Sequence, residues 1–177
     1  MKWFPLRKAS GESLAVSMAG IKLGDRLMIL GCSDPRLIAR LAVKTGLTGR
    51  AYAVDESEAS AASASDVATR EGALIESATA SWTSLPIEAG TFDVAVIRDV
   101  LPALAADRRA GCAGEVLRIL RPGGRALVID SARAARKPDY AAQRGAAGVL
   151  ESQGFRASRV LAERDGLVFA EGIKANA

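Results

Sequence analysis

The sequence predicts an α/β protein built on a doubly wound, mostly parallel sheet. Three observations carry this prediction: strand-like and helix-like segments alternate five times, the first predicted strand is a continuous apolar run, and the chain ends with a hairpin signal. Strands that alternate with helices favour a parallel sheet covered on both faces, which buries its strands completely. The 177 residues are expected to form one domain, with residues 1–24 as an N-terminal strap and helix and residues 25–177 as the core.

The first half of the chain supplies three predicted strands and three predicted helices. The strands are expected at residues 26–30, 50–54 and 73–79, and the helices at residues 14–21, 35–45 and 56–71. In 35–45 the apolar residues recur at helical spacing, and Gly46 ends this helix. Because 56–71 is rich in Ala and Ser, it is expected to be a surface helix or a loose segment.

The second half adds four strands. Two are expected at residues 92–97 and 125–130, and helices at residues 106–120 and 143–153, with a turn at the "RPGG" of residues 121–124. Asp165-Gly166 lies between two segments of alternating polarity, which is a strong hairpin signal. The expected result is a mostly parallel sheet of seven strands with a C-terminal antiparallel hairpin.

Composition excludes several classes of function. The formal net charge is +4, but Lys and Arg are spread along the chain, so no nucleic-acid partner is expected. Histidine is absent, which excludes a His-based triad, a His-liganded metal site and a His general base; no metal site is expected. Cys32 and Cys112 form no pair motif, and no apolar run approaches the ~18 residues that span a bilayer. We therefore expect a cytoplasmic protein without membrane contact.

The loop after the first predicted strand, in "LMILGCSDPRL", is the least usual part of the sequence. Gly31 ends the strand, but Ser33 and Pro35 stand where nucleotide-binding loops usually have further glycines. Asp34 can cap the helix that follows, and proline suits the first helical position. Asp34 has a second interpretation, as a carboxylate that faces the amino group of a cofactor.

Six candidate site residues fall at or just after the ends of predicted strands, which is where ligands of open α/β sheets lie. These residues are Gly31, Asp55, Ser81, Trp82, Arg98 and Asp99. Asp55 follows Gly31 at close to the ~20-residue spacing of an acid that accepts hydrogen bonds from ribose hydroxyls. The alternative is a helix cap or a loop acid, and Glu56 beside it is a weaker candidate for the ribose.

Four segments, spread over about residues 21–174, resemble the class I S-adenosylmethionine-dependent methyltransferases, especially the small-molecule enzymes of the ubiquinone-biosynthesis type. They are "GIKLGDRLMILGC", "FDVAVIRDVLPAL", "EVLRILRPGGRALVID" and "LESQGFRASRVLAERDGLVFAEGIK". The resemblance implies a Rossmann-like sheet, S-adenosylmethionine as the cofactor and methyl transfer to a small-molecule acceptor.

The resemblance also implies a cofactor site and shows where this chain departs from the family. The candidate cofactor-binding residues are Gly31, Cys32, Ser33, Asp55, Glu56, Ser81, Trp82 and Arg98. Ile29 stands where the family has an acid, and Ser33 and Pro35 stand where it has glycines. Ser81 replaces an acid that the family often places near the adenine. Trp82 either covers the face of the base or packs in the core.

Methyl transfer is a direct displacement, so an enzyme mainly has to hold the nucleophile and the methyl group in line. Where a base is needed, Asp99 is the best-placed candidate, ahead of Asp130 and Tyr140. Each of these three has an alternative interpretation, as a cap or turn acid or as a tyrosine packed on the core. Arg98 either offsets an anion or pairs with Asp99, and Cys32 is expected to be a packing residue.

Two other functions compete with methyl transfer. One is a catalytically inactive, methyltransferase-like binding or partner subunit with weak or no cofactor binding, favoured by the four departures from the family pattern. The other, a nicotinamide-dependent oxidoreductase, is disfavoured because the Gly-x-Gly-x-x-Gly loop is missing. A homo- or hetero-oligomer is also open, since Trp3 and Phe4 could contact a second subunit or pack on the chain's own core.

Overall fold

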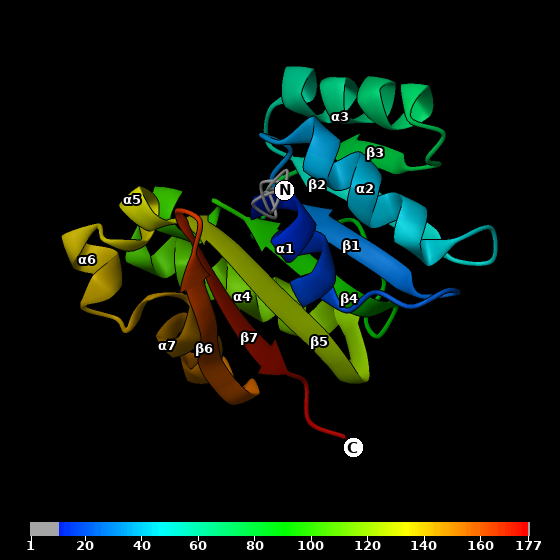
Figure 1. The fold of residues 1–177 in the computed structure, drawn as a ribbon. Coiled ribbons are helices and arrows are strands. Elements are labelled where there is room, and N and C mark those ends of the chain that lie inside the picture. Colours follow the sequence, from blue (N-terminus) through cyan, green and yellow to red (C-terminus); the bar gives the residue numbers. More distant parts are fainter. Residues whose placement is uncertain (1–10, 177) are drawn as a thin grey trace, which may run out of the picture.

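The computed structural model describes residues 11–176 and contains one mixed sheet with the strand order β3-β2-β1-β4-β5-β7-β6. The strands are β1 (Arg26–Leu30), β2 (Arg50–Asp55), β3 (Glu76–Thr79), β4 (Phe92–Arg98), β5 (Leu120–Ser131), β6 (Arg156–Arg164) and β7 (Leu167–Ile173). The first five are parallel, whereas β7 runs antiparallel to both β5 and β6 (Figure 1). This architecture confirms the predicted seven-stranded, doubly wound sheet with a C-terminal hairpin.

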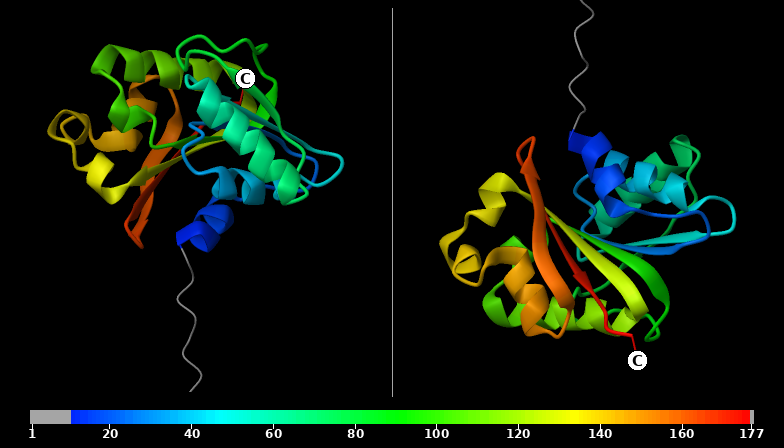
Figure 2. Two further views of the ribbon diagram at one scale, coloured as in Figure 1. Left: turned by 90° about the horizontal axis from the view of Figure 1, so that it is seen from above. Right: turned by 60° about the horizontal axis from the view of Figure 1, so that its bottom comes forward.

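Helices cover both faces of the sheet (Figures 1 and 2). On one face lie α1 (Gly11–Ala19), α2 (Pro35–Thr45) and α3 (Glu58–Arg70), and on the other lie α4 (Ala106–Ile119) and α7 (Gly145–Ser152). Short helices follow two of the strands: η1 (Leu101–Ala103) after β4, and α5 (Ala132–Ala135) and α6 (Pro138–Ala141) after β5. No helix of the described residues is both long enough and apolar enough to cross a membrane.

The central strand β1 shows why the sequence pattern identified the sheet. Leu27 and Ile29 pack in the core beneath α1–α3, while Met28 and Leu30 pack in the core beneath α4 and α7. All four side chains are 0–1% exposed, because a parallel strand covered on both faces has no polar side. Truncating one of them, such as Ile29, to alanine typically costs about 2–5 kcal/mol.

Some boundaries differ from the predicted ones for local reasons. Strand β3 begins at Glu76 and not at residue 73, because the N–H of Ala73 donates to the carbonyl of Ala68 and closes the end of α3. The "RPGG" turn lies within the bounds of β5: Leu120 is opposite Phe92, and the register then shifts before pairing resumes. The predicted hairpin turn is confirmed, since Asp165 and Gly166 both have the positive φ of a type I′ turn.

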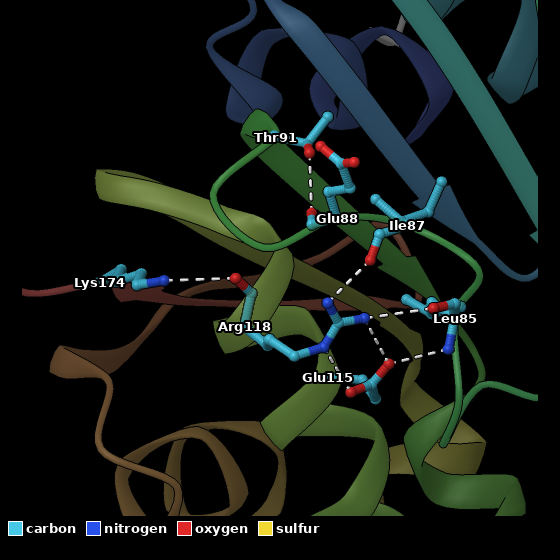
Figure 3. A network of polar contacts seen from close by, with 7 residues as sticks. All are labelled: Leu85, Ile87, Glu88, Thr91, Glu115, Arg118 and Lys174. Atoms are coloured by element: carbon cyan, nitrogen blue, oxygen red, sulfur yellow. Dashed lines mark hydrogen bonds and ion pairs between the residues drawn. The ribbon is translucent and has the colours of Figure 1, made fainter.

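The long connection from β3 to β4 is anchored to α4 (Figure 3). Arg118 donates to the carbonyls of Ile87 and Leu85 at 2.7 and 3.2 Å, and Glu115 accepts the N–H of Leu85 at 2.8 Å. The two side chains also hydrogen-bond each other at 2.7 and 2.8 Å, which holds both in place and lowers the pKa of Glu115. The connection, residues 80–91, includes Ser81 and Trp82 and is therefore fixed near its middle.

Candidate active site

Gly31 begins the loop between β1 and α2, and its conformation is set by the packing of the strands. Its φ is +90°, and its N–H donates to the carbonyl of Val54 at 3.0 Å. A Cβ atom here would collide with the carbonyl oxygen of Arg98 and lie 2.8 Å from the side chain of Val100. Glycine is therefore required by the close approach of β4, independently of any ligand.

Asp55, at the end of β2, ties two loops together. Its carboxylate accepts the N–H of Cys32 at 2.7 Å and the N–H of Ser57 at 2.8 Å. Asp55 is 8% exposed, and the N-cap of α3 is Ser57. Since a carboxylate offers about four acceptor sites, these two bonds leave acceptor capacity on both oxygens.

The unusual loop forms a regular helix start. Asp34 accepts the N–H of Leu37 at 3.1 Å and so caps α2, and Pro35 occupies its first turn. The structure thus shows the capping interpretation of Asp34. Ser33 is exposed, and it is not among the non-glycine residues with positive φ in the described chain.

Cys32, between Gly31 and Ser33, is a packing residue as expected, 1% exposed. Burial, followed by the nearby charge of Asp55, raises the pKa of its thiol to about 12. A thiol with this pKa is not a nucleophile at neutral pH.

Glu56, Ser81 and Trp82 meet at one carboxylate. Glu56 Oε1 accepts the hydroxyl of Ser81 at 3.2 Å and the backbone N–H of Trp82 at 3.3 Å. The same oxygen forms an ion pair with Arg108 in the first turn of α4. Sequence reasoning missed Arg108, because an ion pair between residues 52 positions apart leaves no pattern in the chain. The Trp82 ring packs against the core, and its indole N–H is buried without a partner.

Arg98 and Asp99 form an ion pair, which is one of the two roles expected for Arg98. Arg98 also donates to the carbonyl of Ile129 at 3.2 Å, and Asp99 accepts the N–H of Ser131 at 2.6 Å. The pair therefore joins the carboxyl ends of β4 and β5. Asp99 has a φ of +53°, a conformation that non-glycine residues adopt mostly at turns and functional sites.

Asp130 and Tyr140, considered separately in the sequence, form one buried pair. The Tyr140 hydroxyl donates to Asp130 Oδ2 at 2.8 Å, and Asp130 is 1% exposed. Burial is the largest influence on this carboxyl and raises its pKa to about 7; the Tyr140 hydrogen bond lowers the pKa, and the charge of Asp99 raises it. Burial, followed by the charge of Asp130, also raises the pKa of Tyr140.

A second residue that the sequence did not reveal, the buried Arg109, holds Tyr140 from α4. Its guanidinium carbon lies 5.0 Å from the centroid of the Tyr140 ring, a cation–π distance. The same side chain donates to the carbonyl of Leu101 at 3.0 Å and to Gln143 at 3.2 Å, and it pairs with Asp139. Arg109 thus fastens the segment after β5 to α4.

The carboxyl edge of the sheet is also where hydrogen-bond partners are missing. Within residues 14–176, three buried side-chain atoms lack a partner: Trp82 Nε1, Arg98 Nε and Asp130 Oδ1. They belong to residues at or just after the ends of β3, β4 and β5. Buried polar atoms are nearly always paired, so these three atoms distinguish the carboxyl edge of the sheet from the rest of the described interior. The described side chains include no cluster of three or more metal-ligating groups.

Comparison with known proteins agrees with this architecture. The "Methyltransferase domain" family matches residues 28–128, more than half of the chain. No curated protein matches the sequence.

Solved structures extend the likeness over the whole fold. A SAM-dependent methyltransferase from Aquifex aeolicus has a TM-score of 0.77 and 18% identity, covering 93% of this chain and 89% of its own. The [4+2]-cyclase SpnF has a TM-score of 0.74 and 17% identity, with 94% and 80% covered. A methyltransferase from Haloferax volcanii, described as putative and solved with the Trm112 activator, has a TM-score of 0.72 and 15% identity, with 93% and 88% covered. Identities this low establish a shared fold. Together with the family match, they show that the chain belongs to the methyltransferase-domain family of class I S-adenosylmethionine-dependent methyltransferases.

Proposed function

We propose that the chain binds S-adenosylmethionine at the carboxyl ends of β1, β2 and β3 and transfers the methyl group to a small-molecule acceptor. The observation that carries the proposal is the convergence of three loops on two adjacent carboxylates. Asp55 holds the loop after β1, and Glu56 holds the loop after β3. A nucleoside ligand needs such acceptors, because its ribose hydroxyls are hydrogen-bond donors.

The residues at this edge fit an adenosyl group chemically. Asp55 and Glu56 would accept from the ribose hydroxyls, and the unpartnered indole N–H of Trp82 would donate to a ring nitrogen of the base. Ser33 is exposed, so the altered loop presents no buried side chain in place of the missing glycine. Arg108, Ser81 and Trp82 all contact Oε1 of Glu56, so Oε2 is the oxygen proposed to accept from the ribose. Gly31, Cys32, Ser81 and Arg98 complete the proposed site.

When bound, the cofactor supplies a methyl group on a positively charged sulfur. The chain's own residues would orient the two reactants and accept a proton. Asp99, fixed by Arg98 and by the N–H of Ser131, is the proposed acceptor of a proton from the nucleophile. Its carboxylate joins the carboxyl ends of β4 and β5, and β4 pairs with β1, one of the strands of the proposed cofactor site.

The second candidate is an inactive, methyltransferase-like partner subunit. It is favoured because both carboxylates already have partners within the chain: the two oxygens of Asp55 accept backbone N–H groups, and Glu56 is paired with Arg108. The Haloferax volcanii neighbour was solved with an activator protein, so a partner belongs to this alternative. Trp3 and Phe4, the suggested contacts, lie outside the described residues. A cytoplasmic location is part of either proposal, supported by two buried free cysteines.

Calorimetric titration with S-adenosylmethionine and with its demethylated product tests the proposal. We expect micromolar binding of both, and a 10- to 100-fold loss in E56A, since a hydrogen bond to a charged group contributes about 1.5–3 kcal/mol. E58A is the matched control, because Glu58 is exposed in the first turn of α3. If neither ligand binds, the proposal is wrong and the partner subunit is favoured.

A further inference from the structure

A cavity of about 250 Å³ lies between the β6–β7 hairpin and the segment from α5 to α7. It is lined by the buried pair of Asp130 and Tyr140, by apolar side chains of both strands and helices, and by charged side chains. The charged and polar lining residues are Asp130, Arg136, Tyr140, Arg144 and Glu163. None of them belongs to the cofactor site proposed above, and this inference does not rest on that proposal.

Asp130 is the residue of this cavity with an unmet bonding requirement. Oδ2 accepts from Tyr140, but Oδ1 has no partner among the described side chains and backbone. The residue is 1% exposed, so bulk water does not solvate this oxygen. An acceptor left in this condition is costly, and a donor inside the cavity would remove the cost.

The positive charges at the cavity are already neutralised. Arg136 pairs with Glu163 at 2.7 Å, and Arg144 pairs with Glu151. These four side chains are more than half exposed, so they stand at the solvent side. Both lining arginines are therefore paired with glutamates. The group that still lacks a partner is the acceptor Asp130 Oδ1, which favours a ligand with a hydrogen-bond donor, preferably a positively charged one.

The walls indicate the rest of the ligand. Val160, Val168 and Ala170 come from the hairpin, and Ala141 and Ala146 come from the helical segment. A cavity of roughly 150 Å³ suffices for a benzene-sized body, so 250 Å³ accommodates one ring and a short polar group. The apolar lining favours a ligand with an apolar body, and Asp130 favours a hydrogen-bond donor at one end of that ligand.

We propose that this cavity is a binding site for a small primary amine with a short apolar body, whose ammonium donates to Asp130 Oδ1. The apolar part contacts the valine and alanine walls. The Arg136–Glu163 pair borders the entrance and stays intact. This amine site, beside β5, β6 and β7, is separate from the proposed cofactor site at the ends of β1, β2 and β3.

Benzylamine is the probe, with benzyl alcohol and benzoate as matched compounds that keep the ring and change the charge. Binding to the full chain is measured at pH 8 by ligand-observed NMR titration. We expect benzylamine to bind at least tenfold more tightly than benzyl alcohol, and benzoate not to bind. Equal binding of benzoate, or no binding of benzylamine, would overturn the proposal.

Variants locate the binding. D130N removes the charge with little change of shape and should weaken benzylamine binding at least tenfold, whereas A141L fills the cavity from α6 and should abolish it. Leu74 is 85% exposed in a different cavity, at the C-terminal ends of α2 and α3, so L74A should leave the affinity unchanged. Should D130N fail to fold, A141L still decides: unchanged affinity in A141L would place the amine elsewhere and refute the site.

The pH dependence gives an independent readout. Several charged and titratable groups lie near Asp130: Tyr140 and Arg109 on one side, Arg98 at the end of β4 with Asp99 directly after it, and Arg136, Arg144 and Glu163 around the cavity. Because the ammonium pairs with the ionised carboxyl, the affinity for benzylamine should rise severalfold from pH 6 to pH 8 and stay flat in D130N. A flat profile in the unmodified chain would contradict the pairing.

Discussion

Asp55 and Asp130 stand at the carboxyl ends of two strands of one sheet, and both are buried, at 8% and 1% exposure. Their partners differ. Asp55 accepts two backbone N–H groups from the loops on either side, whereas Asp130 accepts one phenolic hydroxyl and keeps one oxygen without a partner. The two aspartates therefore occupy equivalent strand ends but differ in how many hydrogen bonds replace their lost hydration.

The difference shows what each carboxylate contributes. Backbone donors compensate Asp55 for its lost hydration, so its charge holds the loops of β1 and β2 together. A single side-chain donor does not compensate Asp130, and burial raises its pKa to about 7. One acid is a structural link, and the other is poised to change its protonation near neutral pH.

The largest expected effect is on the pH dependence of stability. Asp130 has a pKa of about 7 in the folded chain and near 3.8 when unfolded, so the folded state holds the proton more tightly. Its contribution is fully present below pH 4 and is lost as the pH rises through 7, by as much as about 4 kcal/mol. Urea unfolding from pH 4 to pH 8 measures this loss, and the difference between the unmodified chain and D130N isolates it. A constant difference would contradict the raised pKa.

The second effect is the loss of the link at β2. D55A should destabilise the fold by about 3 kcal/mol, because the N–H groups of Cys32 and Ser57 lose their acceptor. Denaturant unfolding at pH 7 measures it. D66A is the control, since Asp66 is exposed on α3 and its removal should cost less than about 0.5 kcal/mol. If the two variants are equally stable, Asp55 is not the link that its contacts indicate.

A smaller effect tests the hydrogen bond from Tyr140 to Asp130, at the end of β5. Y140F deletes the only donor to Asp130 among the described residues, so it should cost about 1–2 kcal/mol. Because that hydrogen bond lowers the pKa of Asp130, the midpoint of the pH profile should move upward in Y140F. NMR titration of the Asp130 carboxyl carbon follows the midpoint, and a downward shift would mean that Tyr140 does not donate to it.

The smallest expected effect concerns Ser33. Since its side chain is exposed and its φ is not positive, S33G should change the unfolding free energy by less than about 0.5 kcal/mol. Affinity for S-adenosylmethionine, measured by calorimetry, should also stay within about threefold. A clear gain in affinity would show instead that the serine side chain narrows the cofactor site.

The sequence predicted those parts of the molecule in which neighbouring residues act together. The bounds of β1 and α2 follow from a short apolar run and from Asp34-Pro35, and the hairpin follows from Asp165-Gly166. These signals are local, because caps and turns involve residues only a few positions apart.

The sequence could not predict how the polar residues at the edge are paired. The acids were identified from their positions after the predicted strands, but Arg108 and Arg109 were not identified, although each contacts a candidate residue. Their partners lie on other elements, and long-range polar pairs leave no periodicity. The short helices α5 and α6 were missed for a related reason: each has only four residues and is fixed by contacts with the rest of the chain.

Arg108 and Arg109 are neighbours in the first turn of α4, yet one reaches Glu56 and the other reaches Tyr140. A single helical turn thus contacts both the loop after β2 and the segment after β5. Fraying of this one turn would break both contacts together.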